Sequence, residues 1–321
     1  SAEKKVKYVI HPMIDALKTK GKLLTIHASG NDPANQIIKK IWPKENPFPS
    51  LSNSIIQYLK KNSDKNLLDK LNFKSKKIID ENLNKIINFK NYREKKNIVE
   101  DMWSNYGKTF AEYLYLYKFK NNKFINPHIK IKGEEILENV INKKKPVIFV
   151  SGHFANYELM AMEIVKKGVN LATIYRPLNN FFLNPFMEYL RRKHVCKNQI
   201  KKGVVGTRNV FNYLKKNYSI ALMIDQRVSE GIGIPFFGQK ALTTTLPAQI
   251  ALRYKYEIVP IYLSRLPDDN FEMEVFEPID TQNMEENEKN KVEISLSLNK
   301  ILEKMILKDP KQWIWTHNRW K

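Results

Sequence analysis

A short apolar run that is followed at once by a polar turn and a helical pattern constrains the fold more than any other stretch. Residues 147–150 (Val-Ile-Phe-Val) lie between Pro146 and the pair Ser151-Gly152, which predicts a strand that is buried on both faces. From Ala155 onward, apolar residues recur at helical spacing. Strands buried on both faces are typical of parallel sheets that helices cover on each side.

The same alternation continues to the end of the chain and predicts an α/β fold with a mainly parallel sheet flanked by helices. The expected strands are 147–151, 170–175, 219–224 and 257–263, with 271–276 alternating like an edge strand. The expected helices are 155–167, 184–194, 206–216, 246–255 and 287–307, and residues 195–205 have no clear pattern.

The first part of the chain has a different character. Residues 74–117 carry apolar stripes at helical spacing, whereas short apolar pieces in residues 1–73 are broken by Gly, Pro and Lys. The three prolines in 42–49 exclude a regular helix there, and this segment is either a linker or a segment that lies on a surface. We therefore expect a helical or irregular N-terminal extension, 1–73, and an α/β domain with a helical lead-in, 74–321.

No run of eighteen apolar residues exists, so the sequence predicts neither a transmembrane span nor a signal peptide. The net charge of +22 indicates a protein that binds nucleic acid, an anionic membrane surface or an acidic partner. The alternative is that the lysines only cover solvated faces. Cys196 is the single cysteine, which excludes an intrachain disulfide and a cysteine-based metal cluster.

The first candidate for catalysis is His153, which follows the buried strand, with Glu158 five residues later. A carboxylate near an imidazole holds one tautomer and stabilises the protonated ring, as a general base requires. The spacing alone is weak evidence for a catalytic pair, because His27 and Asp32 have the same spacing. His153 is the better candidate because a strong strand precedes it and a helical pattern follows.

A second group of candidates follows the next expected strand, where Tyr175 and Arg176 precede Pro177. Ligands of open parallel sheets bind beyond the carboxyl ends of the strands, so Arg176 and His153 share one edge if their strands are neighbours. A guanidinium there can hold a phosphate or a carboxylate. The alternative is a surface arginine beside a turn.

A third group follows the strand 219–224, where Asp225 and Gln226 lie at its carboxyl end. The loop beyond them contains Phe236 and Phe237, which must pack on the core, line a ligand channel or touch a membrane. Arg208 lies at the start of the helix that leads into this strand.

These blocks, in this order, resemble the lysophospholipid acyltransferase-like superfamily. The blocks are His-Phe-Ala-Asn-Tyr-Glu after Val-Ile-Phe-Val-Ser-Gly, then Tyr-Arg-Pro, then Asp-Gln-Arg with Pro-Phe-Phe-Gly and a threonine run. More narrowly they resemble the lipid A late acyltransferases, the lauroyl and myristoyl transferases of lipopolysaccharide biosynthesis. Residues 312–321 and the helical lead-in with Asn82 and Glu112 are similar to that family too, so the resemblance covers about residues 75 to 321.

The resemblance implies transfer of a fatty acyl chain from the thioester of acyl carrier protein to a hydroxyl of a lipid A precursor of the Kdo-lipid IVA type. In this mechanism His153 is the general base and Glu158 orients it, as a His-x4-Glu pattern, with no covalent intermediate, cofactor or metal. Arginine side chains contact phosphates of either substrate, and phenylalanines wall the acyl chain. The expected substrate-binding residues are Tyr175, Arg176, Arg208, Asp225, Gln226, Phe236, Phe237 and Arg319.

The resemblance also implies an enzyme at the cytoplasmic face of the bacterial inner membrane, peripheral or weakly anchored, with an acidic carrier protein and an anionic glycolipid as partners. Alternatives are acylation of another lysophospholipid or glycolipid, thioester hydrolysis by the same His–Glu pair, and a basic membrane or nucleic-acid binding protein without catalysis. Nucleic acid is not expected, because the sequence has no RNP, zinc-finger or helix-turn-helix signature.

Overall fold

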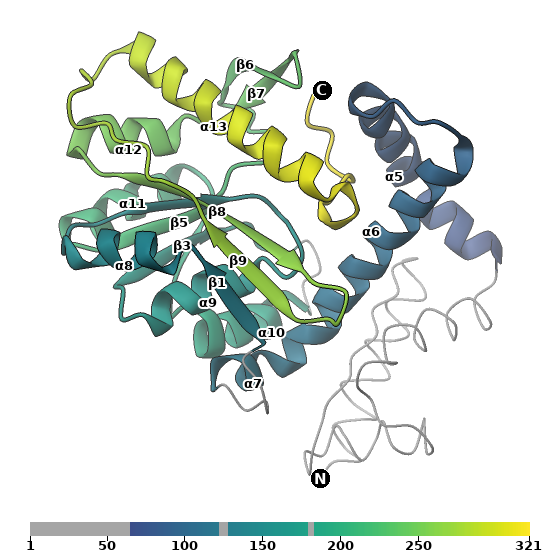
Figure 1. The fold of residues 1–321 in the computed structure, drawn as a ribbon, viewed down its shortest axis with the longest axis horizontal. Helices are drawn as coiled ribbons and strands as arrows, with labels where there is room; N and C mark the ends of the chain where they lie inside the picture. The colour runs from purple at the N-terminus through teal and green to yellow at the C-terminus, as the bar shows by residue number, and fades with distance from the viewer. Residues whose placement is uncertain (1–64, 122–127, 179–182) are drawn as a thin grey trace.

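The structure, a computed structural model, describes residues 65–121, 128–178 and 183–321. Its centre is a seven-stranded sheet in the order β1-β9-β8-β2-β5-β3-β4 (Figure 1). The strands are β1 (Ile129–Lys132), β2 (Ile148–Ser151), β3 (Leu171–Tyr175), β4 (Asn198–Lys201), β5 (Ser219–Met223), β8 (Ile258–Arg265) and β9 (Phe271–Val275). The five strands from β8 to β4 are mutually parallel, and β9 pairs antiparallel with β8 and parallel with β1. The α/β fold and the mainly parallel sheet are as predicted.

Helices cover both faces of this sheet, as a sheet with two apolar faces requires (Figure 1). Those between and after the strands are α8 (Glu134–Asn142), α9 (Glu158–Lys166), α10 (Leu183–Leu190), α11 (Val204–Lys215), α12 (Leu246–Tyr254) and α13 (Glu288–Lys308). A π-helical turn, Arg191–Val195, extends α10, and a short 3-10 turn, Pro310–Gln312, follows α13.

Strand alternation divides the core into two clusters. On β2, Ile148 and Val150 pack with residues of α11, α12 and α13, whereas Phe149 between them packs with residues of α8, α9 and α10. All three side chains are at most 1 % exposed. The period of two along the strand therefore selects which helices each residue contacts.

Two helices precede the sheet: α5 (Lys65–Ile86) and α6 (Tyr92–Glu112), which continues through a 3-10 turn, Tyr113–Tyr115, into α7 (Leu116–Lys120). The predicted boundary at 73/74 falls inside α5. Asn82 of α5 is 1 % exposed and donates to the carbonyl oxygens of Trp315 and His317, which ties the C-terminal segment to this helix. His27 and residues 42–49 lie outside the described residues.

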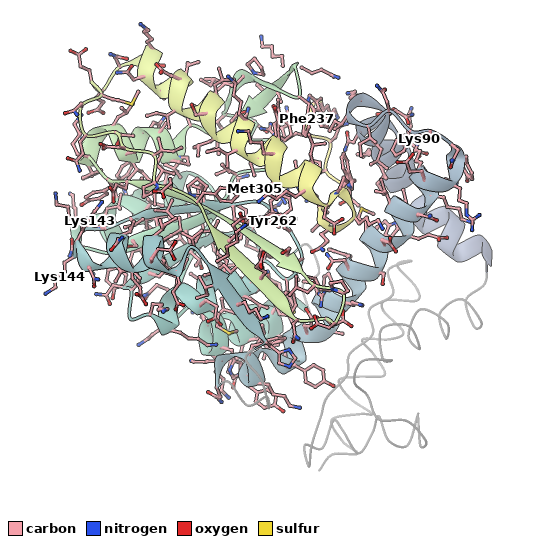
Figure 2. All side chains as sticks on the ribbon, viewed as in Figure 1. Lys90, Lys143, Lys144, Phe237, Tyr262 and Met305 are labelled. Atoms are coloured by element: carbon pink, nitrogen blue, oxygen red, sulfur yellow. The ribbon has the colours of Figure 1, made fainter. Side chains whose placement is uncertain are left out.

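Figure 2 shows how the charge and the core are separated. Lys143 and Lys144 are exposed and point away from the rim of the sheet, whereas Tyr262 and Met305, which are 4 % and 1 % exposed, lie between the sheet and α13. Among the described residues, no helix is both long enough and apolar enough to cross a membrane.

Three features differ from the sequence-based expectation. The strand β9 is not an edge strand, because β1 pairs along its other side. Four residues are too few to reveal the alternation of β1, and β4 was missed for the same reason within residues 195–205. Apart from these three features, the loop after β5 contains a two-stranded hairpin of β6 (Ile232–Phe236) and β7 (Gln239–Thr243), whose turn is Phe237-Gly238.

Candidate active site

The candidate site lies at the carboxyl edge of the parallel strands, where such sheets bind their ligands. His153 follows β2, Asp225 and Gln226 follow β5, Arg176 follows β3, and Lys202 follows β4. Because the sheet order is β2-β5-β3-β4, these residues come from four adjacent strands. The sequence analysis placed His153 and Arg176 at one edge on the condition that their strands are neighbours. In the structure β5 lies between β2 and β3, and the two residues share the edge because all three strands are parallel.

The turn between β2 and α9 gives His153 its place. The helix begins at Glu158, so residues 152–157 form an irregular turn in which Ala155 has a φ of 44°. A Cβ on Gly152 would lie 2.6 Å from Cε2 of Phe154 and 3.3 Å from Cβ of Asp225. Glycine at this position therefore leaves room for the buried ring of Phe154 beside the end of β5.

Asp225 is the carboxylate that contacts His153. Its Oδ1 lies 2.8 Å from Nδ1 of His153, and its Oδ2 accepts from the backbone N–H of His153 and from Nε1 of Trp313, both at 2.9 Å. Burial acts to raise the pKa of the Asp225 carboxyl, but the imidazole and these N–H donors outweigh burial and hold that pKa well below its usual range. A buried ionised carboxylate on Nδ1 directs the other ring nitrogen, Nε2, to act as the base.

Glu158 has other partners, which corrects the expectation that it orients His153. It is 8 % exposed, and its Oε1 accepts from Nε of Arg191 at 2.7 Å and from the hydroxyl of Tyr113. Nη2 of Arg191 donates to the same hydroxyl at 2.7 Å. Burial raises the pKa of the Tyr113 hydroxyl, and the charge of Glu158 raises it further. Five residues of sequence separation span a tight turn here, which leaves the two side chains in different networks.

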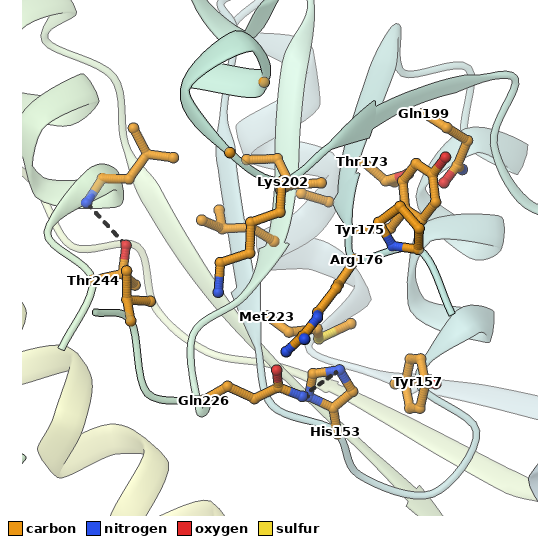
Figure 3. Close-up of a pocket in the computed structure, with 18 of the residues that line it drawn as sticks. His153, Tyr157, Thr173, Tyr175, Arg176, Gln199, Lys202, Met223, Gln226 and Thr244 are labelled. Atoms are coloured by element: carbon orange, nitrogen blue, oxygen red, sulfur yellow. Dashed lines mark hydrogen bonds between the residues drawn. The ribbon is translucent and has the colours of Figure 1, made fainter. Parts of the chain in front are cut away.

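A pocket of about 690 Å³ opens at this edge of the sheet (Figure 3). His153, Glu158, Tyr175, Arg176 and Gln226 line it, as does the C-terminal segment through His317. Its apolar lining includes Met160, Ala161, Leu222, Met223, Val210 and Leu246. A cavity of this size with an apolar wall and a few convergent polar groups is typical of a small-molecule site. Within the described residues, no group of three or more His, Cys, Asp or Glu side chains could hold a metal ion.

Two cations point into this pocket in Figure 3, Arg176 toward His153 and Lys202 toward its centre. Burial lowers the pKa of the Lys202 ammonium, and the neighbouring charge of Arg176 lowers it further. In the described part of the chain, no carboxylate forms an ion pair with either side chain. Two like charges that face one cavity favour an anionic ligand, which relieves their repulsion.

A second histidine lies beside the first. His317 is 6.1 Å from His153 between ring centroids, and Gln226 lies between them, with its Nε2 2.7 Å from Nε2 of His317. Burial lowers the pKa of His317 to about 4, and the neighbouring His153 adds to this shift. Burial thus keeps His317 neutral at physiological pH.

Several predicted substrate contacts lie elsewhere. Phe236 is 0 % exposed and stacks on Trp320, so it belongs to the core and not to an acyl-chain wall, and Phe237 does not line the pocket either. Arg319 is 0 % exposed and donates to the carbonyl of Leu242 and the hydroxyl of Thr243, which leaves it unable to reach a phosphate. Arg208 is exposed on α11, outside the pocket lining.

The sequence analysis missed Lys202, Trp313, His317 and the Arg191–Tyr113 pair as site residues. Lys202 directly follows β4, which was not recognised, so its position at a strand end was hidden. Trp313 lies 88 positions from its partner Asp225 and His317 lies 91 positions from Gln226, and no local pattern connects them. Only the resemblance of residues 312–321 to a family C-terminus drew attention to that segment.

A parallel α/β sheet with a histidine at its carboxyl edge and a pocket into which two cations point is an arrangement typical of a transferase or hydrolase. The family model of bacterial lipid A biosynthesis acyltransferases matches residues 63–321, so the chain belongs to that family and is an acyltransferase. No curated protein matches the chain. Among solved structures, it is similar to the 1-acyl-sn-glycerophosphate (LPA) acyltransferase PlsC from Thermotoga maritima, with 12 % identity and a TM-score of 0.34. That similarity covers 72 % of this chain and 96 % of the other.

Proposed function

We propose that this enzyme transfers a fatty acyl chain from the thioester of acyl carrier protein to a hydroxyl of a lipid A precursor of the Kdo-lipid IVA type. The observation that carries the mechanism is the contact of His153 with the buried, ionised Asp225. This contact fixes the tautomer in which Nε2 is unprotonated and available to the pocket.

In the proposed reaction, Nε2 of His153 takes the proton of the acceptor hydroxyl while its oxygen attacks the thioester carbonyl. The imidazolium that forms is stabilised by Asp225. The tetrahedral intermediate then collapses, the carbon–sulfur bond breaks, and the leaving thiolate takes the proton from His153. His153 is thus unprotonated again at the end of the reaction, and no covalent enzyme intermediate forms.

The cations of the pocket have two roles in this proposal. The guanidinium of Arg176, which Figure 3 shows on the side of His153, stabilises the oxyanion that develops on the thioester carbonyl. Together with Lys202 it holds a phosphate of the anionic acceptor. The apolar wall of Met160, Leu222 and Met223 takes the acyl chain.

The net charge of +22 supports the proposed partners. A basic enzyme is attracted to an acidic carrier protein and to an anionic leaflet, and both attractions fall as salt rises. We place the enzyme as a peripheral protein on the cytoplasmic face of the bacterial inner membrane, where both substrates are accessible.

The test is acyl transfer from acyl carrier protein to a purified lipid A precursor by the full chain, with His153→Ala and, as a matched control, His194→Ala. Loss of product in the His153 variant alone supports the proposal. A His153→Ala enzyme with the wild-type rate contradicts it.

The same assay separates the neighbouring functions. Transfer to a lysophospholipid but not to the lipid A precursor would mean that the acceptor is wrong. Release of free fatty acid without acylated product would identify a thioesterase. We expect Arg176→Met to lower kcat and Lys202→Met mainly to raise KM for the phosphorylated acceptor.

A further inference from the structure

The contact between Gln226 and the two histidines has a geometry that the proposed reaction does not explain. Nε2 of Gln226 is 3.4 Å from Nδ1 of His153 and also 3.4 Å from its Nε2. An atom at that equal distance from both ring nitrogens lies over the face of the ring, because an in-plane position would clash with the carbon between them. The amide therefore does not occupy the in-plane lone pair of His153 Nε2, the atom that must accept the hydroxyl proton.

The amide has a better partner on its other side. Its nitrogen lies 2.7 Å from Nε2 of His317, a normal hydrogen-bond distance. A carboxamide nitrogen only donates, so His317 accepts and carries its own proton on Nδ1. Figure 3 shows the amide oxygen of Gln226 turned toward Arg176.

Hydrogen bonds hold the backbone around His317 in place. Its carbonyl oxygen accepts from Nδ2 of the buried Asn82 at 2.8 Å, and Trp313, four residues earlier, is bound to Asp225. The charged and titratable groups that act on its ring are His153, Asp225, Arg176 and Lys202. Burial and the net positive surroundings keep its ring unprotonated, which is the state that can accept.

We propose that His317 is a positioning residue: by accepting from the Gln226 amide it holds that amide over His153 and leaves the His153 Nε2 lone pair open to the acceptor hydroxyl. Without His317 the amide loses its acceptor. Both ring nitrogens of His153 are 3.4 Å away, but Nδ1 is bound to Asp225, so Nε2 is the one that can accept. Gln226 is partly buried, and a donor that loses its protein partner there is less stable, so the amide moves to that nitrogen and blocks the base. This inference rests on the proposed role of His153 as the base.

The first experiment tests the arrangement without any turnover. Long-range ¹H–¹⁵N NMR spectra of the full chain, which has six histidines, report the tautomer of each imidazole. We expect His317 to be neutral at pH 7 with its proton on Nδ1. A proton on Nε2 overturns the proposal, because His317 then donates to the Gln226 oxygen and the amide is reversed.

The second experiment measures transfer kinetics. His317→Phe, which removes the acceptor but keeps a ring, should lower kcat between about 10-fold and 100-fold with little change in KM for either substrate. His317→Gln, which returns an acceptor oxygen near the position of Nε2, should restore part of that loss. His194→Phe is the control and should have the wild-type rate.

A double-mutant comparison separates positioning from simple packing. In a Gln226→Met background no amide can move onto His153, so adding His317→Phe should cost little further activity. If the two losses multiply, or if His317→Phe alone keeps the wild-type kcat, the proposal is wrong. Wild-type transfer that survives in His153→Ala defeats the proposed function instead, and the NMR result still decides the arrangement.

Discussion

Two buried carboxylates, Glu158 and Asp225, lie beside one pocket. The partner of Glu158 is always charged, whereas the partner of Asp225 is charged only after it takes a proton. Glu158 is bound to Arg191, which stays protonated at every physiological pH, so its charge is balanced at rest. Asp225 is bound to His153, whose charge appears only when the ring takes a proton. In the proposed reaction, Asp225 is therefore the carboxylate that faces the charge formed on His153.

The surroundings of the two carboxylates agree with this difference. Glu158 is bound by Arg191 and by the Tyr113 hydroxyl, and these two partners are also bound to each other. For Asp225, N–H donors from the His153 backbone and from Trp313 maintain the ionised form and leave one oxygen for the imidazole. We infer that the Glu158 network holds the start of α9 in place and that the Asp225 network serves catalysis.

The largest effect that can test this comparison is expected from Asp225→Asn. The amide can donate to Nδ1 of His153 and favour the wrong tautomer, so kcat should fall by about 10³-fold to 10⁴-fold, as for the corresponding change in serine-protease triads. Steady-state kinetics measure kcat, and a thermal melt checks that the variant is folded. An Asp225→Asn enzyme with a kcat within tenfold of wild type would break the comparison.

The next largest effect is expected on stability, from Glu158→Gln. This change leaves Arg191 charged in a site where its side chain is 8 % exposed, and breaking a buried pair in this way costs about 3 kcal/mol. Thermal or chemical unfolding checks it, with Glu100→Gln, a member of an exposed pair with Lys96, as the control.

Removing both charges sharpens that result. Glu158→Gln combined with Arg191→Met should recover most of the lost stability, because no uncompensated charge remains. A double variant that is less stable than Glu158→Gln alone would show that Arg191 has a role beyond the charge of Glu158.

A smaller effect is expected from Trp313→Phe, which removes one N–H donor from Asp225 and keeps an aromatic ring. A hydrogen bond to a charged group contributes about 1.5 kcal/mol or more, so kcat should fall about tenfold. The pKa of Asp225 should rise toward its usual range. Trp315→Phe, whose indole donates to the carbonyl of Pro310, is the matched control and should leave kcat unchanged.

The smallest effect is the pH dependence of stability. Because the pKa of Asp225 is lower in the folded than in the unfolded chain, its contribution is complete above the unfolded value, about 4, and is lost as the pH falls toward the folded value. Unfolding measured against pH should show wild type losing its advantage over Asp225→Asn below about pH 4, by about 1 kcal/mol per pH unit or less. Parallel curves for both proteins would contradict the depressed pKa.

Local pattern determined much of the fold. Residues 147–150 predict a doubly buried strand because four consecutive apolar side chains have no polar face to expose, and the alternation after them predicts a parallel sheet. The four-residue strands β1 and β4 carry too few side chains to show a period, so the edges of the sheet could not be read in this way.

The sequence by itself also favoured His153 over His27, because a residue at the end of a strong buried strand lies at the edge where such sheets bind ligands. It could not determine the partner of that histidine. Five residues of separation made Glu158 the nearer carboxylate along the chain, but the turn at 152–157 sends the two side chains apart.

Only the tertiary structure selected Asp225, which lies 72 positions away in sequence and reaches His153 because β5 pairs with β2. The same holds for Trp313 and His317, which the C-terminal segment brings back over the sheet. Strand order and the path of a terminal segment depend on packing between distant residues. No local spacing encodes those contacts, whereas the periodicity that defines a strand or a helix is local.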